Sequence, residues 1–159
     1  MKNNLQESWW LSLATLGDVR YSSAPGSVAS ALMLPVVLAL YHFEVSASVY
    51  ALLIGGLALA SYMIIQKVLP AFDMHDPKEI VLDECLGMLI TFWTIPVSAF
   101  SIVVGFLLFR LFDISKLFGV RAFEKLPGAW GVLADDVAAG LLALILLKFL
   151  VPIVCVGRF

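Results

Sequence analysis

The chain has 159 residues, of which 62% are hydrophobic and 14% are charged, and its formal net charge is -2. Soluble domains carry about 25% charged residues, and a single domain this small cannot bury so much apolar surface within itself. The composition excludes a disordered chain, a disulfide scaffold and a basic nucleic-acid-binding protein. It favours a small integral membrane protein, and the alternative is a buried helical core within a soluble oligomer.

Four apolar stretches are long enough, or nearly long enough, for membrane helices of about 20 residues. In chain order they are Val28–Phe43, Ser46–Ile65, Leu86–Phe109 and Val137–Val156. The sequence contains no internal repeat and no interdomain linker. We therefore predict one all-α domain over residues 1–159.

The distribution of Lys and Arg predicts which segments face the cytoplasm. The N-terminal segment and the segments 66–85 and 110–131 contain these cations, whereas the connection near Glu44 has none. If Leu86–Phe109 crossed the membrane once, the two later segments would lie on opposite sides. Pro96 removes this conflict, because a proline interrupts the hydrogen bonding of a helix.

We therefore predict a helical hairpin in place of one long span. One helix runs from about Pro77 to Ile95 and the next from about Val97 to Phe112, with a tight turn at Thr94–Pro96. Each helix is about 25 Å long at 1.5 Å per residue, which suits a hairpin or a deep re-entrant pair. The chain then has four to five membrane-embedded helices, with its polar segments at one membrane face.

The first polar segment, Asp76 to Gly87, begins like a helix. Asp76 suits the N-cap, Pro77 suits the first helical position, and Glu79 can close a capping box. This structural role accounts for Asp76 and Glu79 without any chemistry.

Asp83 and Glu84 have no such role, because they would lie two turns inside that helix. Asp83 and Gly87 share one helix face at a spacing of four residues. A glycine on that face allows another backbone or a ligand to approach closely. We therefore treat Asp83 and Glu84 as candidate functional residues.

The second polar segment has Arg110, Asp113 and Lys116 at intervals of three residues. This pattern has two interpretations. One is an ion-paired helix end, and the other is a metal-binding carboxylate flanked by two cations that bind a phosphate.

The third polar segment places Asp135 and Asp136 at the start of a long apolar helix, where they would complement the helix dipole. Gly140 follows Asp136 by four residues on a face of small residues suited to helix packing. An acid that enters a membrane helix on its packing face also indicates function.

These segments together are typical of one chemistry. Carboxylates without His or Cys partners suit Mg²⁺. Cations and the helix start at Pro25-Gly26-Ser27 suit a phosphate group. At the edge of a bilayer, that phosphate would belong to a lipid.

In this order, the motifs resemble the phosphatidylglycerophosphatase A family, which are Mg²⁺-dependent lipid phosphatases of the bacterial inner membrane. The resemblance covers roughly residues 20–145, and Leu117 stands where the family has a proline. The matching residues are Ala24–Ser27, Asp76-Pro77, Ile80-Val81, Asp83-Glu84, Gly87, Phe109-Arg110, Phe112-Asp113, Lys116, Gly131, Asp135-Asp136 and Ala139-Gly140.

The resemblance implies an all-helical, multi-pass membrane protein that hydrolyses phosphatidylglycerophosphate to phosphatidylglycerol and phosphate at a cytoplasm-facing site. It implies that Mg²⁺ is held by Asp83, Glu84, Asp135 and Asp136, with Asp113 as a further candidate ligand. We take as candidate catalytic residues Asp83, Glu84 and Asp136, and as candidate phosphate ligands Gly26, Ser27, Arg110 and Lys116. The expected partners are a phospholipid substrate and the membrane, and we make no prediction of the oligomeric state.

Two other functions remain open at this point. A small transporter or channel would line its path with acids in mid-membrane, but here every acid lies outside the four apolar stretches, and Glu44 lies in the short connection between the first two. A non-enzymatic membrane assembly protein would tolerate the replacement of Asp83 or Asp136 by Asn.

Overall fold

The computed structural model describes residues 9–72, 77–117, 120, 123 and 126–156, and these residues contain helices and no strand, as the sequence predicts. Two 3-10 turns, at Gly17–Tyr21 and Leu69–Ala71, lie between α-helices. The α-helices of this part of the chain are α1 (Trp9–Ala14), α2 (Pro25–His42), α3 (Ala47–Val68), α4 (Leu82–Phe92), α5 (Ala99–Ser115) and α6 (Ala129–Val156).

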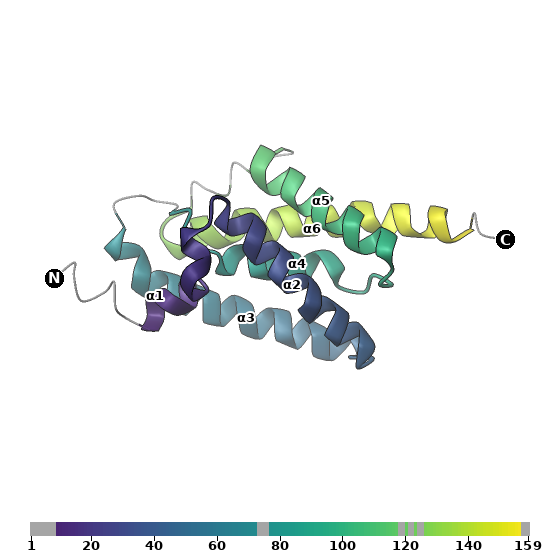
Figure 1. Ribbon diagram of the computed structural model, residues 1–159, viewed down its shortest axis with the longest axis horizontal. Coiled ribbons are helices and arrows are strands. Elements are labelled where there is room, and N and C mark those ends of the chain that lie inside the picture. Colours follow the sequence, from purple (N-terminus) through teal and green to yellow (C-terminus); the bar gives the residue numbers. More distant parts are fainter. Residues whose placement is uncertain (1–8, 73–76, 118–119, 121–122, 124–125, 157–159) are drawn as a thin grey trace.

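Helix α4 is the centre of the fold. All of its residues except Glu84 are buried, and α2, α3, α5 and α6 all pack against it (Figure 1). Its 11 residues give a length of about 16 Å, roughly half the thickness of a bilayer's hydrocarbon core. Helix α4 is therefore a core helix that is too short to cross a bilayer by itself.

The chain reverses between α4 and α5 at residues 93–98, where the sequence predicts a turn at Pro96. Ser98 caps α5, because its hydroxyl oxygen accepts a hydrogen bond from the Ser101 N–H at 3.1 Å. In Figure 1, α2, α4 and α6 run in one direction and α3 and α5 return. The starts of α2, α4 and α6 and the end of α5 thus share one end of the bundle, which we call the polar end.

The predicted start of the fourth helix at Pro77 is wrong, because α4 begins at Leu82. The segment before it is held by tertiary contacts. The Val81 N–H donates to the carbonyl oxygen of Ala14 in α1 at 2.9 Å, and Ile80 and Val81 are buried. Ile80 packs in the same apolar cluster as Ala14 of α1, and Val81 in the same cluster as Ala29 of α2, and this burial outweighs the local helix signal.

This shift changes the position of the acidic residues. Glu79 lies in a turn ahead of the helix, so the predicted capping box does not form there, and Asp76 lies outside the described residues. Asp83 and Glu84 lie in the first turn of α4, not about two turns inside it.

Helix α6 begins earlier than the sequence indicates, at Ala129, so Asp135 and Asp136 do not open it. The Ala129 N–H donates to the side-chain oxygen of Gln66 in α3 at 3.3 Å, which supplies a cap from another helix. The two aspartates therefore lie nearly two turns inside α6, where Asp135 is 4% and Asp136 is 3% exposed.

Helices α4 and α6 touch backbone to backbone at Gly87 and Gly140. A Cβ atom on Gly140 would lie 2.6 Å from the carbonyl oxygen of Gly87, and one on Gly87 would lie 2.9 Å from the carbonyl oxygen of Asp136. No side chain fits at either position without a movement of the helices, because Cβ atoms do not approach other atoms so closely. Glycine is thus required here for close approach.

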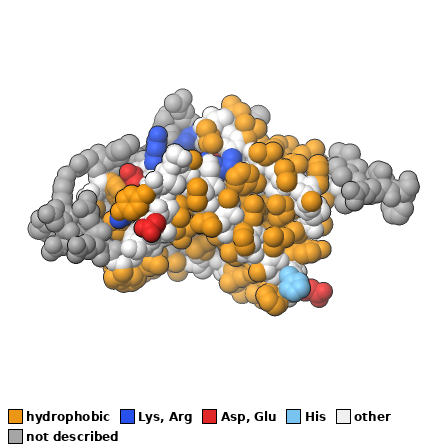
Figure 2. Space-filling view, viewed as in Figure 1, with side chains coloured by type: hydrophobic (Ala, Val, Ile, Leu, Met, Phe, Trp, Pro, Cys, Tyr) orange, Lys and Arg blue, Asp and Glu red, His pale blue; other side chains and the backbone are white. Residues whose placement is uncertain are grey.

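The outer surface of the bundle is largely apolar. Leu52 of α3 is 75% exposed and Leu107 of α5 is 58% exposed. In Figure 2 hydrophobic side chains cover most of the visible face, and many of the Lys, Arg, Asp and Glu side chains gather toward the polar end. Two segments, Pro25–His42 and Ala47–Ala71, are long and apolar enough to cross a membrane.

The glycine contact predicts a stability difference between two similar substitutions. Gly140→Ala should lower the free energy of unfolding by about 1–3 kcal/mol, because the added methyl group has no space. Gly55→Ala is the matched control, since no described atom lies within 4 Å of a Cβ there, and alanine should be neutral or stabilising. Thermal unfolding in detergent measures both, and equal melting temperatures would contradict the tight contact.

Candidate functional site

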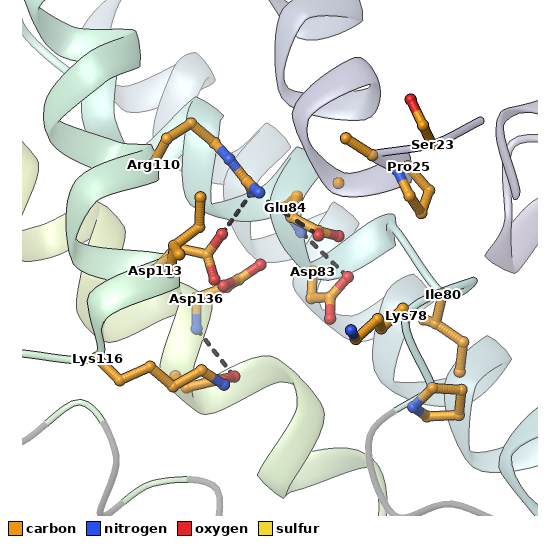
Figure 3. Close-up of a pocket in the computed structure, with 15 residues that line it drawn as sticks. Ser23, Pro25, Lys78, Ile80, Asp83, Glu84, Arg110, Asp113, Lys116 and Asp136 are labelled. Atoms are coloured by element: carbon orange, nitrogen blue, oxygen red, sulfur yellow. Dashed lines mark hydrogen bonds and ion pairs between the residues drawn. The ribbon is translucent and has the colours of Figure 1, made fainter.

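A cavity of about 440 Å³ opens at the polar end of the bundle (Figure 3). Its walls are the start of α2, the segment from Pro77 into the first turn of α4, the last turns of α5 and the second turn of α6. The charged residues that line it are Lys78, Asp83, Glu84, Arg110, Asp113, Lys116, Asp135 and Asp136.

Three of these acids, Asp83, Glu84 and Asp136, form a compact group that we call the carboxylate group. One oxygen atom from each lies within 4.8 Å of the others. The glycine contact explains this geometry, because Asp83 and Asp136 each precede a contacting glycine by four residues, which is about one helical turn. The two parallel helices therefore bring the acids side by side, as the two spacings suggest.

The carboxylate group is buried and only partly satisfied. Asp83 and Asp136 are 6% and 3% exposed, and Oε2 of Glu84 and Oδ2 of Asp136 have no hydrogen-bond partner among the described residues. Glu84 lies ahead of the apolar stretch that begins at Leu86. Burial, together with the negative charge of the nearby Asp113 carboxylate, raises the pKa of Glu84 to about 7. Buried carboxylates that lack partners are costly, so the group requires a proton or a cation.

The donor set fits a hard divalent cation. All of its atoms are carboxylate oxygens, which Mg²⁺ prefers, and around Mg²⁺ adjacent oxygens lie about 3.0 Å apart and opposite oxygens about 4.2 Å apart. The oxygens of the group lie within 4.8 Å of one another. The side chains would therefore move inward to contact one such cation together.

Asp113 and Asp135, the other two predicted metal ligands, each pair with a cation. The Arg110 guanidinium donates a hydrogen bond to Asp113, and Nζ of Lys116 lies 2.7 Å from Oδ2 of Asp135. Arg110 also lies 3.8 Å from Oε1 of Glu84, which connects these pairs to the carboxylate group. Arg110, Asp113 and Lys116 thus take part in ion pairs at the end of α5 and also line the cavity, so an ion-paired helix end does not exclude a place in the site.

The start of α2 lines the cavity, but of the two phosphate ligands predicted there, Gly26 lines the cavity and Ser27 does not. Gly26 lies against Glu84 so closely that a Cβ atom would be 1.9 Å from Oε1 of Glu84. Ser27 is not among the described residues that line the cavity. Gly26 thus leaves space for a carboxylate of the group, and its proposed contact with a phosphate stays a prediction.

The sequence reasoning missed Lys78 and Ser23 as lining residues. Lys78 lies in the turn before α4 and is exposed, and Ser23 comes just before α2. The only available signal was their position beside the motifs, because neither residue type nor spacing distinguishes them from other surface residues.

These features define a charged cavity in an all-helical bundle, with a buried carboxylate group and two cation–carboxylate pairs in its lining. The family model of phosphatidylglycerophosphatase A matches residues 12–151. The chain therefore belongs to the phosphatidylglycerophosphatase A family, as the motifs suggest.

Curated relatives carry related names. The chain is 42% identical over 82 residues to a phosphatidylglycerophosphatase A of Haemophilus influenzae, across 50% of each chain. It is 28% identical over 152 residues to the phosphatidylglycerophosphatase A of Escherichia coli, across 92% of this chain and 85% of that one. A Bacteroides thetaiotaomicron protein with the provisional name phosphatidylinositol-3-phosphatase is 40% identical over 76 residues, or 46% of this chain and 48% of that one.

The match to two of these relatives thus spans about half of their length. No solved structure matches the chain significantly.

Proposed function

We propose that this protein hydrolyses the terminal phosphate of phosphatidylglycerophosphate and releases phosphatidylglycerol and inorganic phosphate. Family membership and the names of two relatives support this substrate. The observation that carries the chemistry is the convergence of Asp83, Glu84 and Asp136 in a cavity that Arg110 and Lys116 also line.

We further propose that the carboxylate group holds Mg²⁺. The unpartnered oxygens of Glu84 and Asp136 and the all-oxygen donor set support this cation. When bound, Mg²⁺ supplies positive charge that neutralises the phosphoryl oxygens and makes phosphorus more open to attack. Asp113 and Asp135, which pair with cations, are further candidate ligands if those pairs open.

The residues of the chain have separable roles in this reaction. Arg110 and Lys116 contact the phosphoryl oxygens and stabilise the charge that develops on them. A carboxylate of the site that does not contact the cation can accept a proton from the attacking water. Asp113 and Asp135 orient the two cations while the site is empty of substrate.

The transporter hypothesis is disfavoured by the position of the acids. The carboxylate group lies at the polar end of the bundle, within the first turn of α4 and the second turn of α6. The apolar interior beyond it, around Phe92 and Leu147, forms the main hydrophobic core. An ion path would require polar side chains along that core.

We propose that the bundle lies in the bacterial inner membrane with four to five embedded helices and the polar end toward the cytoplasm. Helices α5 and α6 have exposed apolar side chains, as α2 and α3 do. Helix α4 forms the re-entrant arm of the α4–α5 hairpin.

The distribution of cations supports the orientation. The described cations of the polar end include Lys67, Lys78 and Arg110. Lys148 lies at the opposite end, 5.8 Å from the ring of Trp93. This asymmetry matches the rule that cytoplasmic segments carry more cations.

The first prediction concerns activity and metal dependence. The purified protein in detergent should release phosphate from phosphatidylglycerophosphate with Mg²⁺ and stop when EDTA is added. Asp83→Asn and Asp136→Asn should lower the rate at least about a hundredfold, because each removes a charge from the carboxylate group.

Glu44→Gln is the matched control, because Glu44 is an exposed acid in the turn between α2 and α3, and its rate should equal that of the wild type. Full activity in EDTA would refute the role of the metal. Normal rates in both aspartate variants would support the assembly-protein alternative.

The second prediction concerns topology. In a background without Cys85 and Cys155, a cysteine at Ser98→Cys should react with a membrane-impermeant thiol reagent from outside the cell. Ser115→Cys should react after the membrane is opened. Both positions are exposed, and they lie at opposite ends of α5. Labelling of both from the same side would refute the orientation of the hairpin.

A further inference from the structure

Three cations of the described residues line the cavity, and one of them differs from the other two. Arg110 pairs with Asp113, and Lys116 pairs with Asp135. No hydrogen bond or ion pair joins Lys78 to another described residue, and its side chain is exposed. The charge of Lys78 is therefore available to an anion that enters the cavity.

The backbone fixes Lys78 at the rim of the cavity. The Ile80 N–H donates to the carbonyl oxygen of Pro77 at 3.0 Å, which closes the turn that carries Lys78. The next residue, Val81, is bonded to Ala14 and buried. Figure 3 shows Lys78 on the side of the cavity opposite Lys116 and Arg110, so an anion at Lys78 is separate from one held by those two cations.

The cavity is also larger than one phosphate requires. Its volume of about 440 Å³ lies within the range of pockets that hold whole small molecules, about 300–1,000 Å³. The substrate proposed above has two phosphates, namely the terminal monoester that is cleaved and the phosphodiester that joins its glycerol to the diacylglycerol. The phosphodiester keeps one negative charge and remains in the product.

We propose that Lys78 binds the phosphodiester of the substrate and so selects lipids that carry a second phosphate. This inference rests on the proposed function. The terminal phosphate lies at the carboxylate group, between Arg110 and Lys116, and the phosphodiester lies at the rim beside Lys78. An ammonium group pairs with such an anion through a charge-assisted hydrogen bond.

The test is a comparison of Lys78→Gln with the wild type in micelles of a neutral detergent, where neighbouring lipids supply no phosphate. KM for phosphatidylglycerophosphate should rise about tenfold, and kcat should change less than KM. Inhibition by phosphatidylglycerol, which carries the phosphodiester, should weaken to a similar extent. Inhibition by inorganic phosphate should stay the same, and Lys78→Arg should restore most of the affinity.

Lys67→Gln is the matched control for net charge. Lys67 is a cation of the polar end whose ammonium lies 3.9 Å from the ring centre of Trp10, and it does not line the cavity. An equal rise of KM in the Lys67 and Lys78 variants would show general attraction of anions and overturn the inference. An unchanged KM in Lys78→Gln would overturn it too and leave the proposed function standing, whereas a wild type without activity on this lipid would refute both.

Discussion

The contact between Gly87 and Gly140 is the constraint on which the site depends. It allows α4 and α6 to approach until their backbones touch, and no other residue type fits at either position. The two helices run in the same direction (Figure 1), so the acids one turn before each glycine come close together. The packing of the core thereby sets the position of Asp83 relative to Asp136, so stability and chemistry share one contact.

The same contact creates an electrostatic cost. It buries carboxylates from two helices within 4.8 Å of one another and leaves oxygens of Glu84 and Asp136 without hydrogen bonds from the described residues. Like charges at this distance raise the free energy of the folded protein unless a cation enters. Arg110, 3.8 Å from Oε1 of Glu84, offsets part of this cost, whereas Lys116 pairs with Asp135 outside the group. Crowded carboxylates that lack hydrogen-bond partners are typical of functional sites, where residues needed for binding lower the stability of the fold.

Much of this arrangement follows from local sequence patterns. The intervals from Asp83 to Gly87 and from Asp136 to Gly140 predicted acids beside small packing residues, and Pro96 predicted the reversal that brings α5 back to the polar end. These features need one helix face or one turn, and periodicity identifies such features from the residues alone.

The remaining features depend on contacts between distant segments. Helix α4 begins five residues later than predicted because Val81 bonds to Ala14, and α6 begins earlier because Gln66 caps it. The division of the acids into a carboxylate group and two ion pairs also depends on how α5 lies across α4 and α6. Local propensity contains no information about such pairings, so the sequence could name the acids but not assign their partners.

Binding of Mn²⁺, followed by electron paramagnetic resonance on the purified protein in detergent, tests the central claim most directly, because Mn²⁺ occupies the same oxygen sites as Mg²⁺. The wild type should remove free Mn²⁺ from solution, and Asp136→Asn should weaken that binding by about tenfold or more, since it removes one ligand of the group. Equal affinity in the wild type and the variant would show that the carboxylates of α4 and α6 do not share a cation.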